Sequence, residues 1–239
     1  MSRFFISKDA ISGKTITITG ADYNHIKNVL RKSAGDKVIC FDSSGTEYDS
    51  RLSSIEKEML TLDIFNESKK NVEPGIKITL AQALPKSSKM DDIVQKSTEL
   101  GVFEIIPVTT ERSIPKSEKN ERWNKIAKES AEQSGRVHVP QIKNTVSFDE
   151  LLKSCGNYDL KLLPWECESS RSLKAELINS KSASSILILI GPEGGFSPAE
   201  AEKAALKGFK SVSLGKRILR TQTAGPATLA MILYEMELE

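Results

Sequence analysis

A run of five branched aliphatic residues, Ile186 to Ile190, most constrains how this 239-residue chain can fold. A strand with no polar residue on either face has to be covered on both sides, which is typical of a parallel sheet between helices. The run stops at Gly191, and Gly194 and Gly195 allow the following turn to adopt positive φ and a ligand to approach its backbone. The sequence therefore predicts a buried strand that ends in an open, glycine-rich loop.

A helix is predicted to begin directly after this loop. Ser197 and Glu200 have the spacing of a capping box, and Pro198 lies at the first helical position. Gly208 is the natural residue to end the helix. In open α/β sheets, nucleotide-like ligands bind at such loops, although an isolated G-x-x-G-G sequence can equally make only a tight turn.

A second strand and loop follow the helix. Residues 211–214 predict a short strand, and residues 215–221 read G-K-R-I-L-R-T. The last helix should start at about Gln222 or later, because Pro226 fits only near a first turn.

The net charge of the whole chain is only +2, yet the segment from Lys203 to Tyr234 has basic residues and no acidic one. We expect Arg217 and Arg220 in this loop to contact substrate phosphate or base.

The two loops together resemble the ribosomal RNA small subunit methyltransferase E family, which belongs to the SPOUT class of knotted methyltransferases. The motifs are G-P-E-G-G-F-S at 191–197 and L-G-K-R-I-L-R-T at 214–221. The resemblance covers nearly the whole chain, with further matches at 3–5, 29–31, 83–86, 95–101 and 132–136. One departure is Gln222, because the family usually has glutamate at this position.

The resemblance implies an α/β fold with a SPOUT-type parallel sheet and a C-terminal trefoil knot, preceded by a small PUA-like β-barrel domain. The residue patterns divide the chain similarly. Residues 1–70 are predicted to be mostly strands with one helix over 22–32, whereas residues 71–239 alternate strands and helices. The polar segment 66–75 is the predicted linker. A knot would not be proposed from these patterns alone, because knots are almost absent from proteins.

The same resemblance implies that the cofactor is S-adenosylmethionine, which needs an apolar slot with backbone donors and acceptors. The residues expected to bind this cofactor lie on three loops: Leu163, Gly191, Pro192, Glu193, Gly194, Gly195, Leu214, Gly215, Ile218 and Leu219. A nicotinamide dinucleotide fits poorly, because no G-x-G-x-x-G motif is followed by an acidic residue about 20 positions later.

The family methylates N3 of one uridine in 16S ribosomal RNA. N3 becomes a nucleophile on losing its proton, and Arg217 or Arg220 could stabilise the negative charge that spreads over the uracil oxygens. Glu193 is a candidate catalytic carboxylate, although a loop glutamate can equally hold the turn together. Gln222 cannot be a general base, so we expect it to form a hydrogen bond. The sequence leaves open which residue accepts the N3 proton. It also leaves open whether naked RNA or the assembled small subunit is the substrate.

The resemblance assigns RNA binding to the amino-terminal domain and implies a homodimer. The expected RNA contacts are Arg3, His25, Arg31, Arg112 and Arg136, of which His25 could instead be a structural helix residue. The last helix carries an apolar stripe that either the subunit's own core or a partner could bury: Leu229, Ile232, Leu233 and Met236.

Composition argues against several other classes. The three cysteines are odd in number and lack C-x-x-C spacing, and only two histidines are present, so neither a disulfide framework nor a metal site is expected. No apolar run approaches the roughly 20 residues that cross a bilayer, and we expect a cytoplasmic protein. Two alternatives remain open: a noncatalytic RNA-binding protein with the same architecture, and an oxidoreductase that uses the glycine loop.

Overall fold

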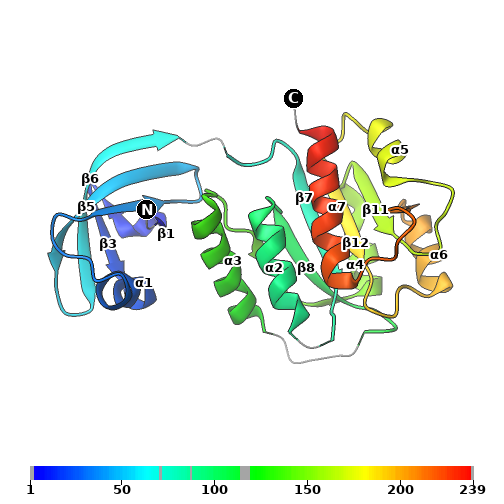
Figure 1. The fold of residues 1–239 in the computed structure, drawn as a ribbon, viewed down its shortest axis with the longest axis horizontal. Helices are drawn as coiled ribbons and strands as arrows, with labels where there is room; N and C mark the ends of the chain where they lie inside the picture. Colours follow the sequence, from blue (N-terminus) through cyan, green and yellow to red (C-terminus); the bar gives the residue numbers. More distant parts are fainter. Residues whose placement is uncertain (1–2, 70–71, 87, 114–118, 238–239) are drawn as a thin grey trace. The chain divides into compact units, whose positions relative to one another are not determined.

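The computed structural model describes residues 3–69, 72–86, 88–113 and 119–237, and the chain divides into two compact units (Figure 1). The first unit contains residues 1–73 together with 131–139. The second contains residues 74–130 and 140–239. The first unit thus includes a short segment from the middle of the chain, which the predicted boundary at 70/71 did not anticipate.

The first unit is built on a six-stranded sheet with the order β1-β4-β5-β6-β3-β2. Its neighbours are antiparallel except β1 and β4, which are parallel. Alternate residues of the strands are buried, which leaves the other face of the sheet polar. The strand bounds are Arg3–Phe5 (β1), Ile11–Ser12 (β2), Thr15–Thr19 (β3), Lys37–Phe41 (β4), Thr46–Ile55 (β5) and Met59–Lys69 (β6).

Two predicted boundaries in this unit are wrong. Strand β6 continues to Lys69, paired with Thr46 of β5, so the segment 66–69 is strand rather than linker. The helix predicted over 22–32 is α1 (Gly20–Asn24), which continues as the π-helical turn η2 (His25–Val29). It stops before Arg31 because this residue has a φ of 52°, which a right-handed helix does not allow.

The second unit contains a parallel sheet with the order β10-β8-β7-β12-β11-β13, and β9 pairs with β8. Strand β12 lies inside this sheet between β7 and β11. Residues 186–190 are all buried, which confirms the prediction of a strand covered on both faces. The strand bounds are Lys77–Ala83 (β7), Glu104–Thr109 (β8), Gln141–Ile142 (β9), Val146–Ser147 (β10), Leu160–Pro164 (β11), Ser185–Ile190 (β12) and Lys210–Val212 (β13).

Helices lie against both faces of this sheet (Figure 1). Leu187 and Leu189 share one core with Phe148 of α4 and Ala204 of α6, whereas α7 contacts β7, β12, α2 and α5. The helix bounds are Lys89–Glu99 (α2), Asn120–Ser134 (α3), Phe148–Ser154 (α4), Leu173–Ile178 (α5), Pro198–Leu206 (α6) and Thr221–Met236 (α7), with short 3-10 turns at Lys8–Ala10 (η1) and Cys155–Asn157 (η3).

The predicted start of α6 is confirmed, whereas α7 begins slightly earlier than predicted. The capping box of α6 is confirmed, since Ser197 Oγ accepts from Glu200 N and Glu200 Oε2 accepts from Ser197 N. Helix α7 begins at Thr221, so Pro226 lies inside the helix rather than in its first turn. Within the described part of the chain, no helix is long and apolar enough to span a membrane.

Candidate active site

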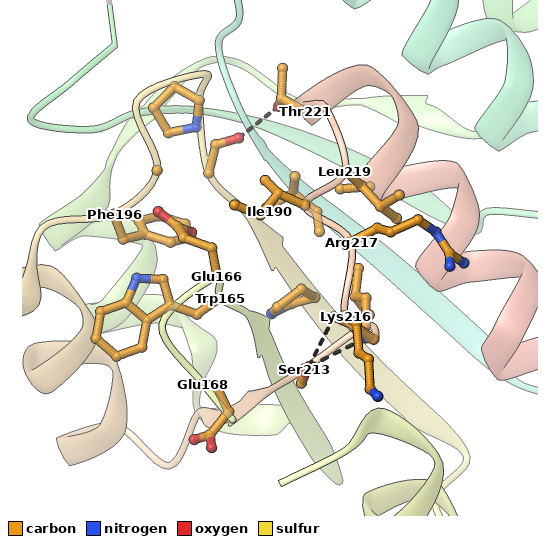
Figure 2. A pocket seen from close by; sticks show the side chains of 18 residues that line it. Trp165, Glu166, Glu168, Ile190, Phe196, Ser213, Lys216, Arg217, Leu219 and Thr221 are labelled. Atoms are coloured by element: carbon orange, nitrogen blue, oxygen red, sulfur yellow. Dashed lines mark hydrogen bonds between the residues drawn. The ribbon is translucent and has the colours of Figure 1, made fainter. Parts of the chain in front are cut away.

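The carboxyl ends of β11, β12 and β13 open onto a pocket in the second unit, where three loops meet (Figure 2). Parallel strands bring these loops to one edge of the sheet. The loops contribute residues 164–166 and 168, 191–192 and 195–196, and 213–219, while the end of β12 adds Ile190 and α7 adds Thr221 and Ala224. Segments separated by about fifty positions in the chain therefore share one site.

Most of the predicted cofactor residues line this pocket: Gly191, Pro192, Gly195, Leu214, Gly215, Ile218 and Leu219. The side chain of Leu163 instead packs in the core beneath α4 and α6. Pro164, which points to the opposite face of the strand, and Trp165, which follows the strand, line the pocket in its place. Glu193 and Gly194 also lie outside the lining.

The first glycine loop is tied to the start of α7 by a buried hydrogen-bond chain. Gln82 Nε2 donates to Thr221 Oγ1 over 3.0 Å, and Thr221 Oγ1 donates to the carbonyl oxygen of Gly191 over 2.6 Å. Gln82 is fully buried near the end of β7. The sequence analysis missed both side chains, although a glutamine near the end of a mainly apolar strand is a signal that could have marked the position.

Two further contacts hold the same loop from outside the pocket. The Glu193 carboxylate lies 2.6 Å from Lys89 Nζ and accepts from the Lys86 amide. Partial burial by itself raises the pKa of Glu193, but the bonds from Lys89 and from backbone amides hold it below the ordinary value. Arg112 Nη1 donates to the carbonyl oxygen of Gly194 over 2.7 Å. Glu193 and Arg112 thus fix the loop, which for Glu193 is the structural alternative left open by the sequence.

The basic residues of the second loop have a different environment. Lys216 and Arg217 line the pocket, and Arg220 is exposed immediately before α7. Among the residues that the structure describes, none of these three side chains forms an ion pair or hydrogen bond. Gln222 Oε1 is buried without a hydrogen-bond partner in the same part of the chain. The loop thus presents positive charge that no described carboxylate neutralises.

Arg3 and Arg136 of the first unit are paired internally, which argues against the expectation that they contact RNA. Arg136 is 5% exposed, and its Nε donates to the Glu73 carboxylate over 3.0 Å. Arg3 Nη2 lies 2.7 Å from Glu47 Oε2, and its guanidinium lies over the Phe41 ring. Burial and ion pairing leave little of either side chain exposed.

Glu73 shows the electrostatic effect of this pairing. Burial by itself raises the pKa of Glu73, but hydrogen bonds and charge from Arg136, with the amides of Val137 and His138, hold the pKa below its ordinary value. The Glu73 carboxylate therefore joins residue 73, at the end of the unit's amino-terminal segment, to the turn after α3.

His25 and Arg31 are exposed on the same unit. The His25 ring makes an edge contact with Phe4, at 5.7 Å between ring centroids. Of the predicted RNA contacts in this unit, these two are therefore the ones that the fold leaves on the surface.

Comparison with known proteins identifies two domains in this chain and a set of similar enzymes. Residues 72–233 match the RNA methyltransferase domain, and residues 18–65 match the RNA methyltransferase PUA domain. The chain is 38% identical to the ribosomal RNA small subunit methyltransferase E of Bacillus subtilis, covering 100% of this chain and 98% of that protein. It is 36% identical to the enzyme of the same name from Synechocystis, covering 96% and 76%.

A solved structure of the same kind is also similar. The ribosomal RNA small subunit methyltransferase E of Neisseria gonorrhoeae, bound to S-adenosyl methionine, is 32% identical, has a TM-score of 0.89, and covers 98% of this chain and 97% of its own. Together with the two matched domains and the loop pocket, these likenesses show that the chain belongs to the ribosomal RNA small subunit methyltransferase E family.

Proposed function

We propose that this protein transfers a methyl group from S-adenosylmethionine to N3 of one uridine in the 16S ribosomal RNA of the small subunit. The observation that carries the proposal is the pocket at the carboxyl ends of β11, β12 and β13, whose loops carry the family motifs. The Neisseria gonorrhoeae relative, solved with S-adenosyl methionine bound, supports the choice of cofactor.

The residues of the pocket fit this cofactor. Ile190, Phe196 and Leu219 offer apolar surface to an adenine ring. The indole Nε1 of Trp165 is buried without a hydrogen-bond partner among the described residues, so it is a donor available to a ligand. Gly215 adopts a φ of 115° with open space where a Cβ would lie, which leaves its backbone accessible. When bound, S-adenosylmethionine supplies a methyl group on a positively charged sulfur.

Arg220 and Arg217 are the proposed catalytic side chains. Methyl transfer is a direct displacement, so the protein has to align the reacting atoms and stabilise developing charge, without a covalent nucleophile. The two guanidiniums donate to the uracil oxygens as N3 loses its proton. Their lack of carboxylate partners in the described chain supports this role. Gln222 contributes a hydrogen bond, for which its unpaired Oε1 is available.

Glu193 is proposed as a positioning residue rather than the proton acceptor. Its carboxylate is engaged by Lys89 and by the Lys86 amide, and its lowered pKa makes it a weak base. Holding the 191–195 loop keeps Gly191 and Gly195 at the pocket. In the same way, the Arg112 bond to Gly194 supports a role in shaping the loop, which is compatible with an additional RNA contact.

RNA binding by the first unit is proposed to rest on His25 and Arg31. Both are exposed, and the matched PUA domain of RNA methyltransferases includes them. Arg3 and Arg136 are left out of this proposal, because their charges are neutralised by Glu47 and Glu73.

A homodimer and a trefoil knot complete the proposal. The buried Leu229 and Ile232 are unavailable to a partner, but Met231 and Tyr234 are exposed on α7. They line an apolar groove with residues of α5, which supports a subunit interface on this face. A Tyr234→Glu protein that remains dimeric in analytical ultracentrifugation would argue against the groove as the interface.

The bond from Thr221 to Gly191 brings the chain beyond β13 back to the end of β12, as a knot in this segment requires.

The runner-up is a noncatalytic RNA-binding protein of the same architecture, suggested by Gln222 in place of glutamate. Titration calorimetry with S-adenosylmethionine separates the two candidates, because a protein that only binds RNA has no reason to retain the cofactor.

The activity itself is tested by incubating the protein and cofactor with small ribosomal subunits, and separately with naked 16S RNA, from a strain lacking this methylation. We expect mass spectrometry of the nucleosides to reveal N3-methyluridine in at least one substrate. Cofactor binding without methyl transfer, or methylation of another atom, would contradict the proposal.

A further inference from the structure

The charged residues of the pocket lie on two opposite walls. Glu166 and Glu168 follow β11 on one wall, and Lys216 and Arg217 follow β13 on the other (Figure 2). They are the charged residues among the described lining of this pocket. A pocket divided in this way is complementary to a ligand that carries both signs of charge.

Glu166 is the acidic residue of this pocket with a free carboxylate. It forms no hydrogen bond or ion pair with any residue that the structure describes. The carboxylate lies close to the backbone of Gly195, since a Cβ built on this glycine would lie 2.0 Å from Glu166 Oε1. The missing side chain at Gly195, which also has a φ of 65°, thus lets a negative charge lie against the cofactor loop.

Glu168 has a different role on the same wall. Its Oε1 accepts from the hydroxyl and amide of Ser170 and from the Arg171 amide. The bond from the Ser170 hydroxyl has the largest effect, and together these bonds hold the pKa of Glu168 below its ordinary value. One carboxylate oxygen of Glu168 is therefore committed to the turn, whereas both oxygens of Glu166 face no described protein donor.

We propose that Glu166 recognises the positive charge of the methionine half of S-adenosylmethionine and so selects this cofactor over neutral adenosine compounds. The methionine half has a sulfonium and an ammonium, both positive, and a carboxylate that suits Lys216 on the opposite wall. Adenine and ribose are common to many cellular molecules, so a pocket that reads only these parts discriminates poorly. This inference rests on the proposed cofactor and adds a specificity-determining residue to it.

The test compares two ligands that share adenosine and sulfur. S-adenosylmethionine has the charged methionine half, whereas 5′-deoxy-5′-methylthioadenosine is a neutral thioether without it. Titration calorimetry is performed on the wild-type protein and on the Glu166→Gln and Glu168→Gln variants. Thermal unfolding midpoints of the three proteins report whether either substitution disturbs the fold.

Glu166→Gln should weaken S-adenosylmethionine binding by about three- to tenfold, a small effect because the carboxylate is solvent-exposed. Binding of the neutral thioether should change by less than about twofold, since no charge interaction is lost. Glu168→Gln removes the same formal charge and should affect S-adenosylmethionine less than Glu166→Gln does.

Equal losses for both ligands in Glu166→Gln would overturn the inference, because they would indicate that Glu166 binds the shared ribose or shapes the loop. No loss for either ligand would overturn it as well. Neither result affects the proposed function, which fails only if the wild-type protein does not bind S-adenosylmethionine or does not transfer its methyl group.

Discussion

Two arginines of the first unit, Arg3 and Arg136, have surroundings opposite to those of Arg217 and Arg220 in the second unit. In the first unit, Arg3 and Arg136 are paired with Glu47 and Glu73. In the second, the pocket-lining Arg217 has no ion-pair partner in the described chain, and the nearby Arg220 has none either. Because a carboxylate partner neutralises the charge of a buried arginine, an arginine motif by itself does not identify an RNA contact. The unpaired residues are the ones that we propose to act on the substrate.

The largest effect that follows from this comparison is on catalysis. Arg220→Ala should lower the single-turnover rate of methyl transfer by about ten- to a thousandfold, the range for removing one stabiliser of a developing anion. Cofactor affinity should persist. Lys207→Ala is a matched control, because Lys207 is a solvated residue of the same basic segment outside the pocket.

Gln222→Glu refines the same prediction. It restores the family residue and should leave the single-turnover rate within about threefold of the wild-type rate, if this position hydrogen-bonds rather than abstracts a proton. A large gain there, or a fully active Arg220→Ala enzyme, would show that the chemistry was assigned to the wrong side chain.

For the paired arginines we expect an effect on stability instead. Arg136→Ala should reduce the free energy of unfolding by about 3 kcal/mol, because it leaves the partly buried Glu73 carboxylate without its partner. Arg122→Ala removes a solvent-exposed arginine from its ion pair with Asp91 and should cost less than about 1 kcal/mol. Urea unfolding measures both. Equal costs for the two variants would mean that burial of the Arg136 pair contributes nothing.

The pH dependence of the same pair gives a smaller effect. Because the pKa of Glu73 is lowered on folding, its contribution is fully present above the ordinary value of 4.5 and is lost as pH falls through the folded-state value. The difference in unfolding free energy between the wild type and Glu73→Gln should therefore shrink when urea unfolding is repeated at decreasing pH below 4.5. A difference that stays constant would contradict the pairing.

The parts of the fold that the sequence predicted are those with local causes. The strand over 186–190 follows from its unbroken aliphatic run, and the start of α6 follows from Ser197, Pro198 and Glu200. Helix α4 has an equally local signal, since Ser147 and Glu150 form a capping box, but the sequence analysis overlooked it.

The parts that the sequence did not predict depend on contacts between distant residues. Glu73 and Arg136 are 63 positions apart, and nothing near either residue indicates the pair. Thr221 reaches Gly191 across 30 positions, and Glu193 reaches Lys89 across 104. A motif places a residue on a loop, but only the assembled fold decides whether its charge remains available.

The salt dependence of RNA binding tests the central claim most directly, because each arginine bound to a phosphate releases counterions. For 16S RNA, Arg217→Gln and Arg220→Gln each remove an unpaired positive charge from the proposed RNA site, and each should reduce the slope of log affinity against log salt by up to about 0.7. Arg136→Gln, measured under conditions where the protein is folded, should leave the slope unchanged. A reduced slope for Arg136→Gln with unchanged slopes for both loop variants would contradict the distinction between paired and unpaired arginines.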